Sequence, residues 1–515
     1  MRAILTLSLA LAWFSTAHAA EDPVCPDDDV REQVTGPRWL RAVSLDLRGT
    51  VPTPEEYALL GDDGVVPDDL IDAWLDTPEF SERTVRHHRS LLWNNLAGTS
   101  FFNTAARIYR TGNRYYRRTL AQRTRGIQST TCGDWENALD EFGHPVEVRA
   151  EEGWRDDGWV WVEPFWAPGT QLRVCTFDAQ TARVSPRGTS CDTADAFSDP
   201  GCGCGPNLEW CVGGRTEALV AEALSVDVDL RVKRVIEEDL PYTELLTGSR
   251  AYVNGPLAHF LRNGSGTGTR LRMERMPYDT IPDLTYDQVD TWEAVDLGPE
   301  QSGVFTSPAF LIRFQTNRAR ANRFSSAFMC QDFQAPDGGL PPSEGLPTLD
   351  LTSRDGCKYC HALLEPEASH WGRWTETGAS YLNPVEFPAY DADCARCASE
   401  GIGCTAECRI YYQVSPLTAE QDPYVGWLKS FEFLEDRHAH HVDEGPSLLI
   451  RQGIADRRLP TCVAQKAVEA MLERPVTEDD KAWVDDLATR FESGGWSYKD
   501  LVHDIVTSPN YRRLP

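Results

Sequence analysis

The sequence predicts a mainly α-helical, multi-domain protein, in which short-helix bundles carry a disulfide-rich, β-containing insertion and a small cysteine-rich loop insertion. Three observations predict this class. Apolar residues recur at helical spacing in the first, middle and last parts of the chain. Most of the fifteen cysteines lie in two segments between these helical parts. The length of 515 residues is several times that of a usual domain.

The first residues predict a secretory signal peptide over residues 1–19. Arg2 supplies positive charge, residues 4–14 are mainly apolar, and Ala17 and Ala19 are the small residues that precede a cleavage point. The apolar stretch is shorter than the roughly 20 residues of a membrane helix, and no later segment approaches that length. We therefore expect a periplasmic or secreted protein without membrane insertion.

The net charge argues against one class of partner. Asp and Glu number 79 against 50 Lys and Arg, which gives a net charge of -29. A surface this acidic repels phosphate backbones and anionic lipids. We expect no nucleic-acid binding.

Helical spacing of apolar residues predicts three helical domains, which cover residues 20–125, 216–333 and 459–515. In the first of them, the sequence from Thr53 to Glu56 is typical of a helix start, with a hydroxyl cap, a proline and a glutamate that reaches back. Thr477 and Asp480 predict a similar start in the last domain.

Residues 126–215 have a different composition and predict a β-containing insertion. Runs at 159–162 and 172–176 favour strands, while Gly, Pro and Asp become frequent. Three internal disulfides are expected from six cysteines: Cys132, Cys175, Cys191, Cys202, Cys204 and Cys211. We expect the tryptophans at 159, 161 and 166 to complete a small core, with partner binding as the alternative.

The segment 334–458 contains the motif with the most specific chemistry, Cys357-Lys358-Tyr359-Cys360-His361. This CxxCH pattern is the attachment signature of c-type haem. Cys357 and Cys360 are spaced to reach the two vinyl groups of one porphyrin, and His361 then lies under the iron as its proximal ligand. We expect one covalent haem c, with a disulfide or a zinc site as the alternatives.

The other cysteines of this half predict structural bridges. A second insertion holds Cys394, Cys397, Cys404 and Cys408, for which two disulfides are favoured over a four-thiolate zinc site. Cys330 and Cys462 lie on flanking helical parts and are candidates for a further disulfide. That pairing leaves Cys25 as the odd thiol.

Several side chains are candidates for the sixth ligand of the haem iron. The candidates are Met329, His370 and His440, the last within a His438-x-His440-His441 sequence whose imidazoles are expected to be solvated. If a side chain fills the sixth coordination position of the iron, electron transfer is favoured. If that position is vacant, ligand binding or peroxide chemistry is favoured.

A group of arginines lies in the same part of the chain, at 313, 318, 320 and 323. We expect these side chains to pair with carboxylates, with haem propionates as the alternative.

At these residues the chain resembles the planctomycete-type cytochrome c domain families, exported domains of unknown function that are also found in myxobacteria. The matching stretches cover about half the chain and follow the family's order. The first is 41–55, which contains Leu-Asp-Leu and Pro-Thr-Pro-Glu. The others are 77–80, 303–311, 317–324, the CxxCH motif and 462–509. The family often follows its haem motif with Asp-Pro-x-Gly, whereas Leu364-Glu365-Pro366-Glu367 stands here. Both cysteine-rich insertions also depart from the common pattern.

The resemblance implies a helical, haem-bearing exported protein of unassigned reaction. Together with the motif, it predicts a c-type cytochrome-like, single-haem electron-transfer or redox module, a carrier rather than a catalyst, that meets a redox partner protein. The alternatives are a haem-free exported binding or surface-structural protein stabilised by disulfides, and a haem enzyme with an open distal site.

Overall fold

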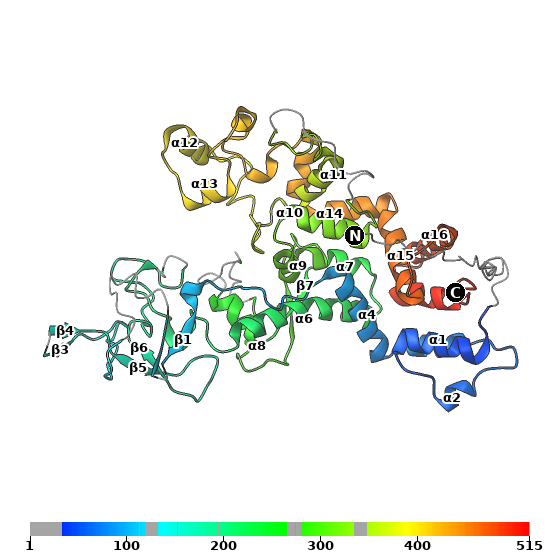
Figure 1. Cartoon of the computed structure of the whole chain (residues 1–515), viewed down its shortest axis with the longest axis horizontal. Helices are drawn as coiled ribbons and strands as arrows, with labels where there is room; N and C mark the ends of the chain where they lie inside the picture. The colour runs from blue at the N-terminus through cyan, green and yellow to red at the C-terminus, as the bar shows by residue number, and fades with distance from the viewer. Residues whose placement is uncertain are drawn as a thin grey trace, which may run out of the picture.

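A computed structural model describes most of the chain: residues 33–112, 114–118, 132–151, 153–193, 196, 198–264, 273, 280–333 and 348–513. Figure 1 shows a mainly helical architecture with small sheets, which confirms the predicted fold class. The predicted signal peptide, Cys25 and the linker at 334–346 lie outside the described residues. Among those that are described, no helix is both long and apolar enough to cross a membrane.

The N-terminal part consists of four helices: α1 (Gly36–Arg48), α2 (Pro54–Tyr57), α3 (Asp68–Leu75) and α4 (Pro78–Leu92). The predicted start of α2 is confirmed, because the Glu56 N–H donates to the Thr53 hydroxyl at 3.2 Å while the Thr53 N–H donates to the Glu56 carboxylate at 2.8 Å. This reciprocal pair satisfies two backbone donors that a helix start leaves without partners.

The first insertion contributes β5 and β6 to a four-stranded sheet in the order β1-β2-β6-β5, and it also forms a hairpin of β3 and β4. Strands β1 and β2 precede residue 126, so the predicted boundary between the helical domain and the β-containing part was wrong: the sheet begins at residue 108, because β2 pairs with β6. The strands are β1 (Ile108–Thr111), β2 (Tyr115–Arg118), β3 (Val148–Ala150), β4 (Gly153–Arg155), β5 (Trp159–Val162) and β6 (Leu172–Cys175). Pairing is antiparallel for β1 with β2 and for β5 with β6, and parallel for β2 with β6. The expected small core is present: Trp159 is buried and Trp166 packs beside Val174, whereas Trp161 is 47% exposed.

The middle of the chain contains α6 (Thr216–Glu237), α7 (Thr243–Thr247), α8 (Gly255–His259), α9 (Pro308–Arg313) and α10 (Asn317–Phe328), with β7 (Arg250–Val253) paired to β8 (Glu293–Asp296). The last third contains α11 (Lys358–Ala368), α12 (Ala392–Glu400), α13 (Ala406–Tyr411), α14 (Asp436–Ala455), α15 (Arg458–Leu472), α16 (Lys481–Ser493) and α17 (Tyr498–Thr507). In Figure 1 the second cysteine-rich insertion, with α12 and α13, projects away from α15 to α17.

One hydrophobic core joins the three helical parts of the chain. It includes Trp39 of α1, Leu224 of α6, Phe324 of α10 and Val468 of α15. The indole N–H of Trp39 in α1 donates to the carbonyl of Val506 in α17 at 3.1 Å, so these two helices lie side by side, and Figure 1 shows the red C-terminal segment next to α1. The helical segments that the sequence predicts as separate stretches are therefore packed together.

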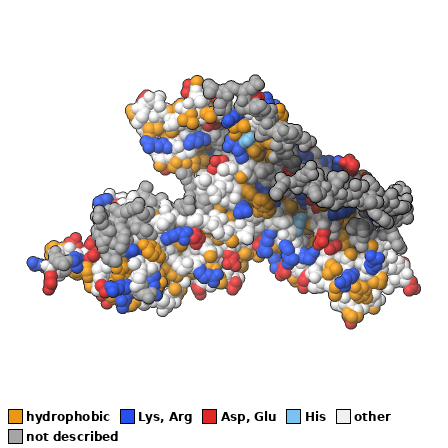
Figure 2. All heavy atoms as spheres, in the orientation of Figure 1, with side chains coloured by type: hydrophobic (Ala, Val, Ile, Leu, Met, Phe, Trp, Pro, Cys, Tyr) orange, Lys and Arg blue, Asp and Glu red, His pale blue; other side chains and the backbone are white. Residues whose placement is uncertain are grey.

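Charged side chains of both signs are interspersed on the face that Figure 2 displays. Ion pairs between elements include Arg89 with Asp229 and Arg107 with Glu217, with nitrogen to oxygen distances of 2.6 Å. These pairs neutralise individual carboxylates locally, while the chain as a whole keeps its excess of acid.

His88 of α4 is a fully buried imidazole whose hydrogen bonds fix its neutral form. Its Nδ1–H donates to the Thr84 carbonyl at 2.8 Å, and its Nε2 accepts from the Tyr242 hydroxyl at 2.8 Å. The carbonyl is only an acceptor, which assigns the proton to Nδ1. Burial lowers the pKa of His88 to about 4.

The buried His88 should make the protein sensitive to acid. The folded-state pKa lies below the unfolded value of 6.5, so the stabilisation is fully present above pH 6.5 and is lost as the pH falls from 6.5 through about 4. The loss is about 3 kcal/mol, at 1.36 kcal/mol per pKa unit. We expect His88→Gln to flatten the slope of unfolding free energy between pH 6.5 and 4, measured by urea unfolding. An unchanged slope would show that another group controls acid unfolding.

Candidate functional site

The CxxCH motif forms the beginning of helix α11. Cys357 is the residue that precedes the helix, and the His361 N–H donates to the Cys357 carbonyl at 3.0 Å. Because positions i, i+3 and i+4 of a helix share one face, this turn places Cys357, Cys360 and His361 together.

The motif's two cysteines differ from all other described cysteines. Six disulfides join Cys132–Cys175, Cys191–Cys202, Cys204–Cys211, Cys330–Cys462, Cys394–Cys408 and Cys397–Cys404. Cys357 and Cys360 belong to none of these disulfides and lie at half-buried positions. The predicted bridges of both insertions and the Cys330–Cys462 bridge are confirmed, and the structure does not contain the alternative bridge between Cys357 and Cys360.

His361 is oriented by a carboxylate on the same helix. Its Nδ1 lies 2.5 Å from Oε1 of Glu365, one turn further along α11. From α10, the Arg318 guanidinium donates to both oxygens of Glu365, at 2.6 and 3.2 Å. With Nδ1 engaged, Nε2 is the ring nitrogen that points away from Glu365 and is available to a metal.

The outer face of α11 carries exposed apolar side chains next to the motif. Tyr359 is 50% exposed and Leu363 is 53% exposed, whereas Leu364 and Ala368 are buried against the helical core. By helix spacing, Tyr359 and Leu363 lie on the side of α11 away from His361, whereas Leu364 and Ala368 continue the face of the motif. The donor set of two cysteines and one imidazole is the one that a c-type haem uses.

A cleft of about 640 Å³ lies on the other side of Glu365, between α11 and the second cysteine-rich insertion. Arg318, Glu365 and Ala368 form part of one wall, and Tyr411 and Leu428 form part of the other. Glu365 therefore connects the imidazole of the motif with the surface of this cleft.

The three candidates for a distal ligand occupy different environments. Met329 at the end of α10 is buried in the core and packs against Gly453 of α14. His370 is 1% exposed and its Nδ1–H donates to the Gly445 carbonyl at 2.9 Å. His440 is exposed on the first turns of α14. The contacts described for these side chains do not include His361.

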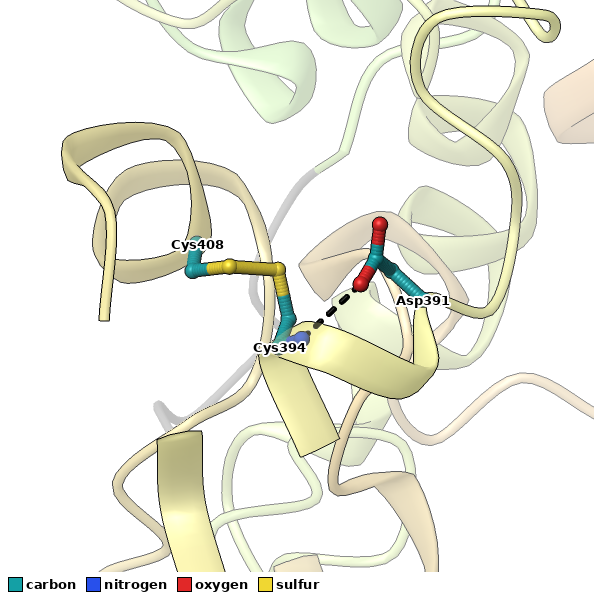
Figure 3. A group of neighbouring side chains, drawn as sticks. All are labelled: Asp391, Cys394 and Cys408. Atoms are coloured by element: carbon teal, nitrogen blue, oxygen red, sulfur yellow. Dashed lines mark hydrogen bonds between the residues drawn. A yellow bond between two sulfur atoms is a disulfide. The ribbon is translucent and has the colours of Figure 1, made fainter. Parts of the chain in front are cut away.

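Asp391, Cys394 and Cys408 form the one group in the described residues whose ligand atoms lie close enough for a metal ion. Figure 3 shows that their arrangement has another cause: the two sulfurs are joined, and the Asp391 carboxylate accepts the Cys394 N–H at 2.8 Å as the cap of α12. With Cys397–Cys404 beside it, the pair leaves no four-thiolate set, so the zinc alternative is wrong for these cysteines.

The arginines of α10 are only partly paired as the sequence predicts. Arg318 binds the carboxylate of Glu365, as expected. Arg320 instead donates to backbone carbonyls. Arg323 donates to the Ser90 carbonyl, and its guanidinium carbon lies 4.1 Å from the centroid of the Trp93 ring. The expectation of carboxylate partners was wrong for Arg320 and Arg323, because the fold brings carbonyl oxygens and an indole ring to them.

Two features of this region were not found from the sequence. In the sequence, Glu365 stands out only as a departure from a family pattern. Its spacing of four residues from His361 nevertheless predicts contact between the two side chains on a helix. The stacking of His441 on the buried His370 joins residues about 70 positions apart, at 4.2 Å between ring centroids. Sequence spacing contains no signal for that contact.

The fold and the cysteine pairing define a mainly α-helical protein with two disulfide-stabilised insertions and a pair of cysteines next to a histidine at a helix start. No protein-family model, curated protein or solved structure matches this chain.

Proposed function

We propose that the chain carries one c-type haem, attached through Cys357 and Cys360 with His361 as the proximal iron ligand, and serves as an electron-transfer or redox module. The main support is the separation of cysteines into two groups. Twelve described cysteines form disulfides with one another, and the two of the CxxCH motif belong to none of these six pairs. Thiols are what thioether formation requires, because each S–H adds across one vinyl group.

The second support is the set of hydrogen bonds that orients His361: Glu365 contacts its Nδ1, and Arg318 donates to the Glu365 carboxylate. Metal-binding histidines usually donate their other ring N–H to a carboxylate or a carbonyl, which fixes the tautomer and the ring orientation. Glu365 has this position, and Arg318 holds Glu365 in place. When bound, the haem supplies one-electron chemistry, and the chain's residues hold it and set the basicity of His361.

The number of disulfides agrees with the proposal that the protein carries a c-type haem. Six disulfides are typical of proteins outside the cytoplasm, where c-type haem is attached. We propose a periplasmic or secreted location and a protein redox partner. The second candidate function is a haem-free exported binding or structural protein, which the exposed Trp154 and Trp161 of the first insertion favour.

A visible spectrum of the protein produced in a host that matures c-type cytochromes tests the proposal. We expect sharp bands on reduction and haem that stays with the chain on a denaturing gel. Colourless protein from that host, with a control cytochrome matured in the same cells, would refute haem attachment and leave the binding-protein function.

Glu365→Gln should raise the reduction potential of the attached haem. The carboxylate increases electron donation by His361 and adds negative charge, and both effects favour the oxidised iron. The potential would be measured by spectroelectrochemical titration.

Glu367→Gln is the matched control for this prediction. Glu367 lies on the same helix but bonds the Ser325 hydroxyl. A similar shift in both variants would indicate a general charge effect rather than the hydrogen bond to His361.

A further inference from the structure

The cleft that Glu365 lines is a concave site built from several parts of the chain. Its walls come from the start of α10, the segment before the CxxCH motif, the end of α11 with the residues after it, and the second cysteine-rich insertion. Its volume of about 640 Å³ falls within the range of roughly 300 to 1,000 Å³ that is usual for small-molecule sites. The cleft is therefore large enough to hold a small organic molecule.

Three aromatic side chains line this cleft. Trp374 follows α11 in the chain and is buried, whereas Tyr411 and Phe433 belong to the second insertion and are half-buried. A second ring supports each of them, with centroids 5.2 Å apart for Trp374 and Tyr381, 5.3 Å for Tyr411 and Phe387, and 5.5 Å for Phe433 and Tyr424. Rings held in this way offer a ligand apolar surface at a small cost in side-chain entropy.

The backbone of the cleft is strained at two positions. Thr377 has a φ of 57° and Phe433 a φ of 58°, in the left-handed region that β-branched and bulky residues rarely adopt. Both residues line the cleft. Strained residues of this kind persist where the surrounding structure fixes them, and they concentrate at ligand-binding sites.

Carboxylates outnumber basic groups along the described part of the cleft. Arg318 binds Glu365, so this pair is neutral. Lys429 is exposed and its ammonium donates to the carbonyls of Arg409 and Ile410. The other charged lining residues are all acids: Asp350, Glu376 and Glu432. The cleft therefore has a net negative charge.

Glu432 is the acid beside the aromatic rings of the insertion. Its carboxylate accepts from the side-chain amides of Gln413 and Gln421, and both of these glutamines are buried. Amides are neutral donors, so they orient the half-buried carboxylate without compensating its charge. Glu432 precedes Phe433 in the chain, which places a negative charge next to an aromatic ring at the cleft.

We propose that this cleft binds an organic cation, an alkylated or quaternary ammonium compound, with Glu432 as its counter-charge and with Tyr411 and Phe433 against its apolar part. The faces of aromatic rings attract such cations, and the carboxylate adds charge complementarity. The net charge of -29 also draws cations toward the protein. Cys357, Cys360 and His361 do not line the cleft, so this proposal does not depend on the haem.

Calorimetric titration of the full chain with benzyltrimethylammonium tests the proposal. We expect one equivalent to bind with a Kd of about 0.1 mM or tighter, and benzyl alcohol, which has the ring without the cation, to bind at least about tenfold more weakly. Binding should be the same in Cys357→Ser/Cys360→Ser, a variant that separates this site from the proposed haem. Equal affinity for benzyl alcohol, or no saturable binding, would overturn the proposal.

Two variants with matched controls locate the binding site. Glu432→Gln should weaken binding of benzyltrimethylammonium by about fivefold or more, whereas Glu407→Gln, an exposed acid of α13 outside the cleft, should change it by less than about twofold. Tyr411→Leu should also weaken binding by about threefold or more, whereas Tyr390→Leu, at a 47% exposed ring outside the cleft, should not.

Circular dichroism and thermal unfolding of each variant check that the fold is kept. Equal effects of each variant and its control would mean that the cation binds at scattered acidic sites on the surface, and the cleft would then not be a ligand site.

Discussion

Replacing Cys357 and Cys360 together by serine is expected to reduce covalently bound haem to background. No other described cysteine can substitute, because the remaining twelve are held in disulfides. Each single replacement should leave one thioether, with a shifted reduced spectrum and a lower yield. Haem staining of a denaturing gel and the pyridine haemochrome spectrum measure both effects.

Cys394→Ser with Cys408→Ser is the matched control for the loss of two sulfurs. This pair removes a disulfide of the second insertion and leaves α11 intact. We expect the control to lose stability and to retain its haem. Full haem content in the double variant of the motif would show that the pigment is attached elsewhere.

Arg320→Met is expected to destabilise the fold by at least about 4 kcal/mol. The Arg320 side chain is completely buried, and burial lowers its pKa to about 9, so it stays charged at neutral pH. Its donors lie 2.8 to 3.3 Å from six acceptors: the carbonyls of Leu311, Phe314, Trp374, Thr375 and Gly378, and the side-chain oxygen of Asn317. Methionine would fill the space but leave buried carbonyls without donors. Urea unfolding gives the change in free energy.

Arg313→Met serves as the reference for this change. Arg313 lies at the end of α9 and is exposed, so its replacement should alter the unfolding free energy by less than about 0.5 kcal/mol. Similar small effects of the two variants would mean that the carbonyls around Arg320 find other donors, such as water.

Local patterns predicted the elements of the fold well. The capping sequence at Thr53 and the strand-favouring runs at 159 and 172 fold as expected, since caps and strand propensity depend on near neighbours. The short spacing of cysteines within each insertion likewise predicted internal bridges.

The partners of individual polar side chains were harder to predict. Nothing near Arg320 in the sequence indicates that residues 374–378 supply its acceptors. The contact of His441 with His370 and the packing of Trp39 against Val506 also join distant segments. Such contacts depend on how whole helices pack, and helix packing is decided by the shape of the complete core.

The sequence by itself determined the helical class, the two disulfide-rich insertions and the CxxCH turn with its two cysteines and one histidine. Those features follow from periodicity, spacing and redox chemistry over a few residues. Only the tertiary structure decided that three helical stretches share one core, that Arg318 supports Glu365 behind His361, and that His441 stacks on His370. These depend on long-range packing, because a side chain's burial and charge partners exist only once remote segments are in contact.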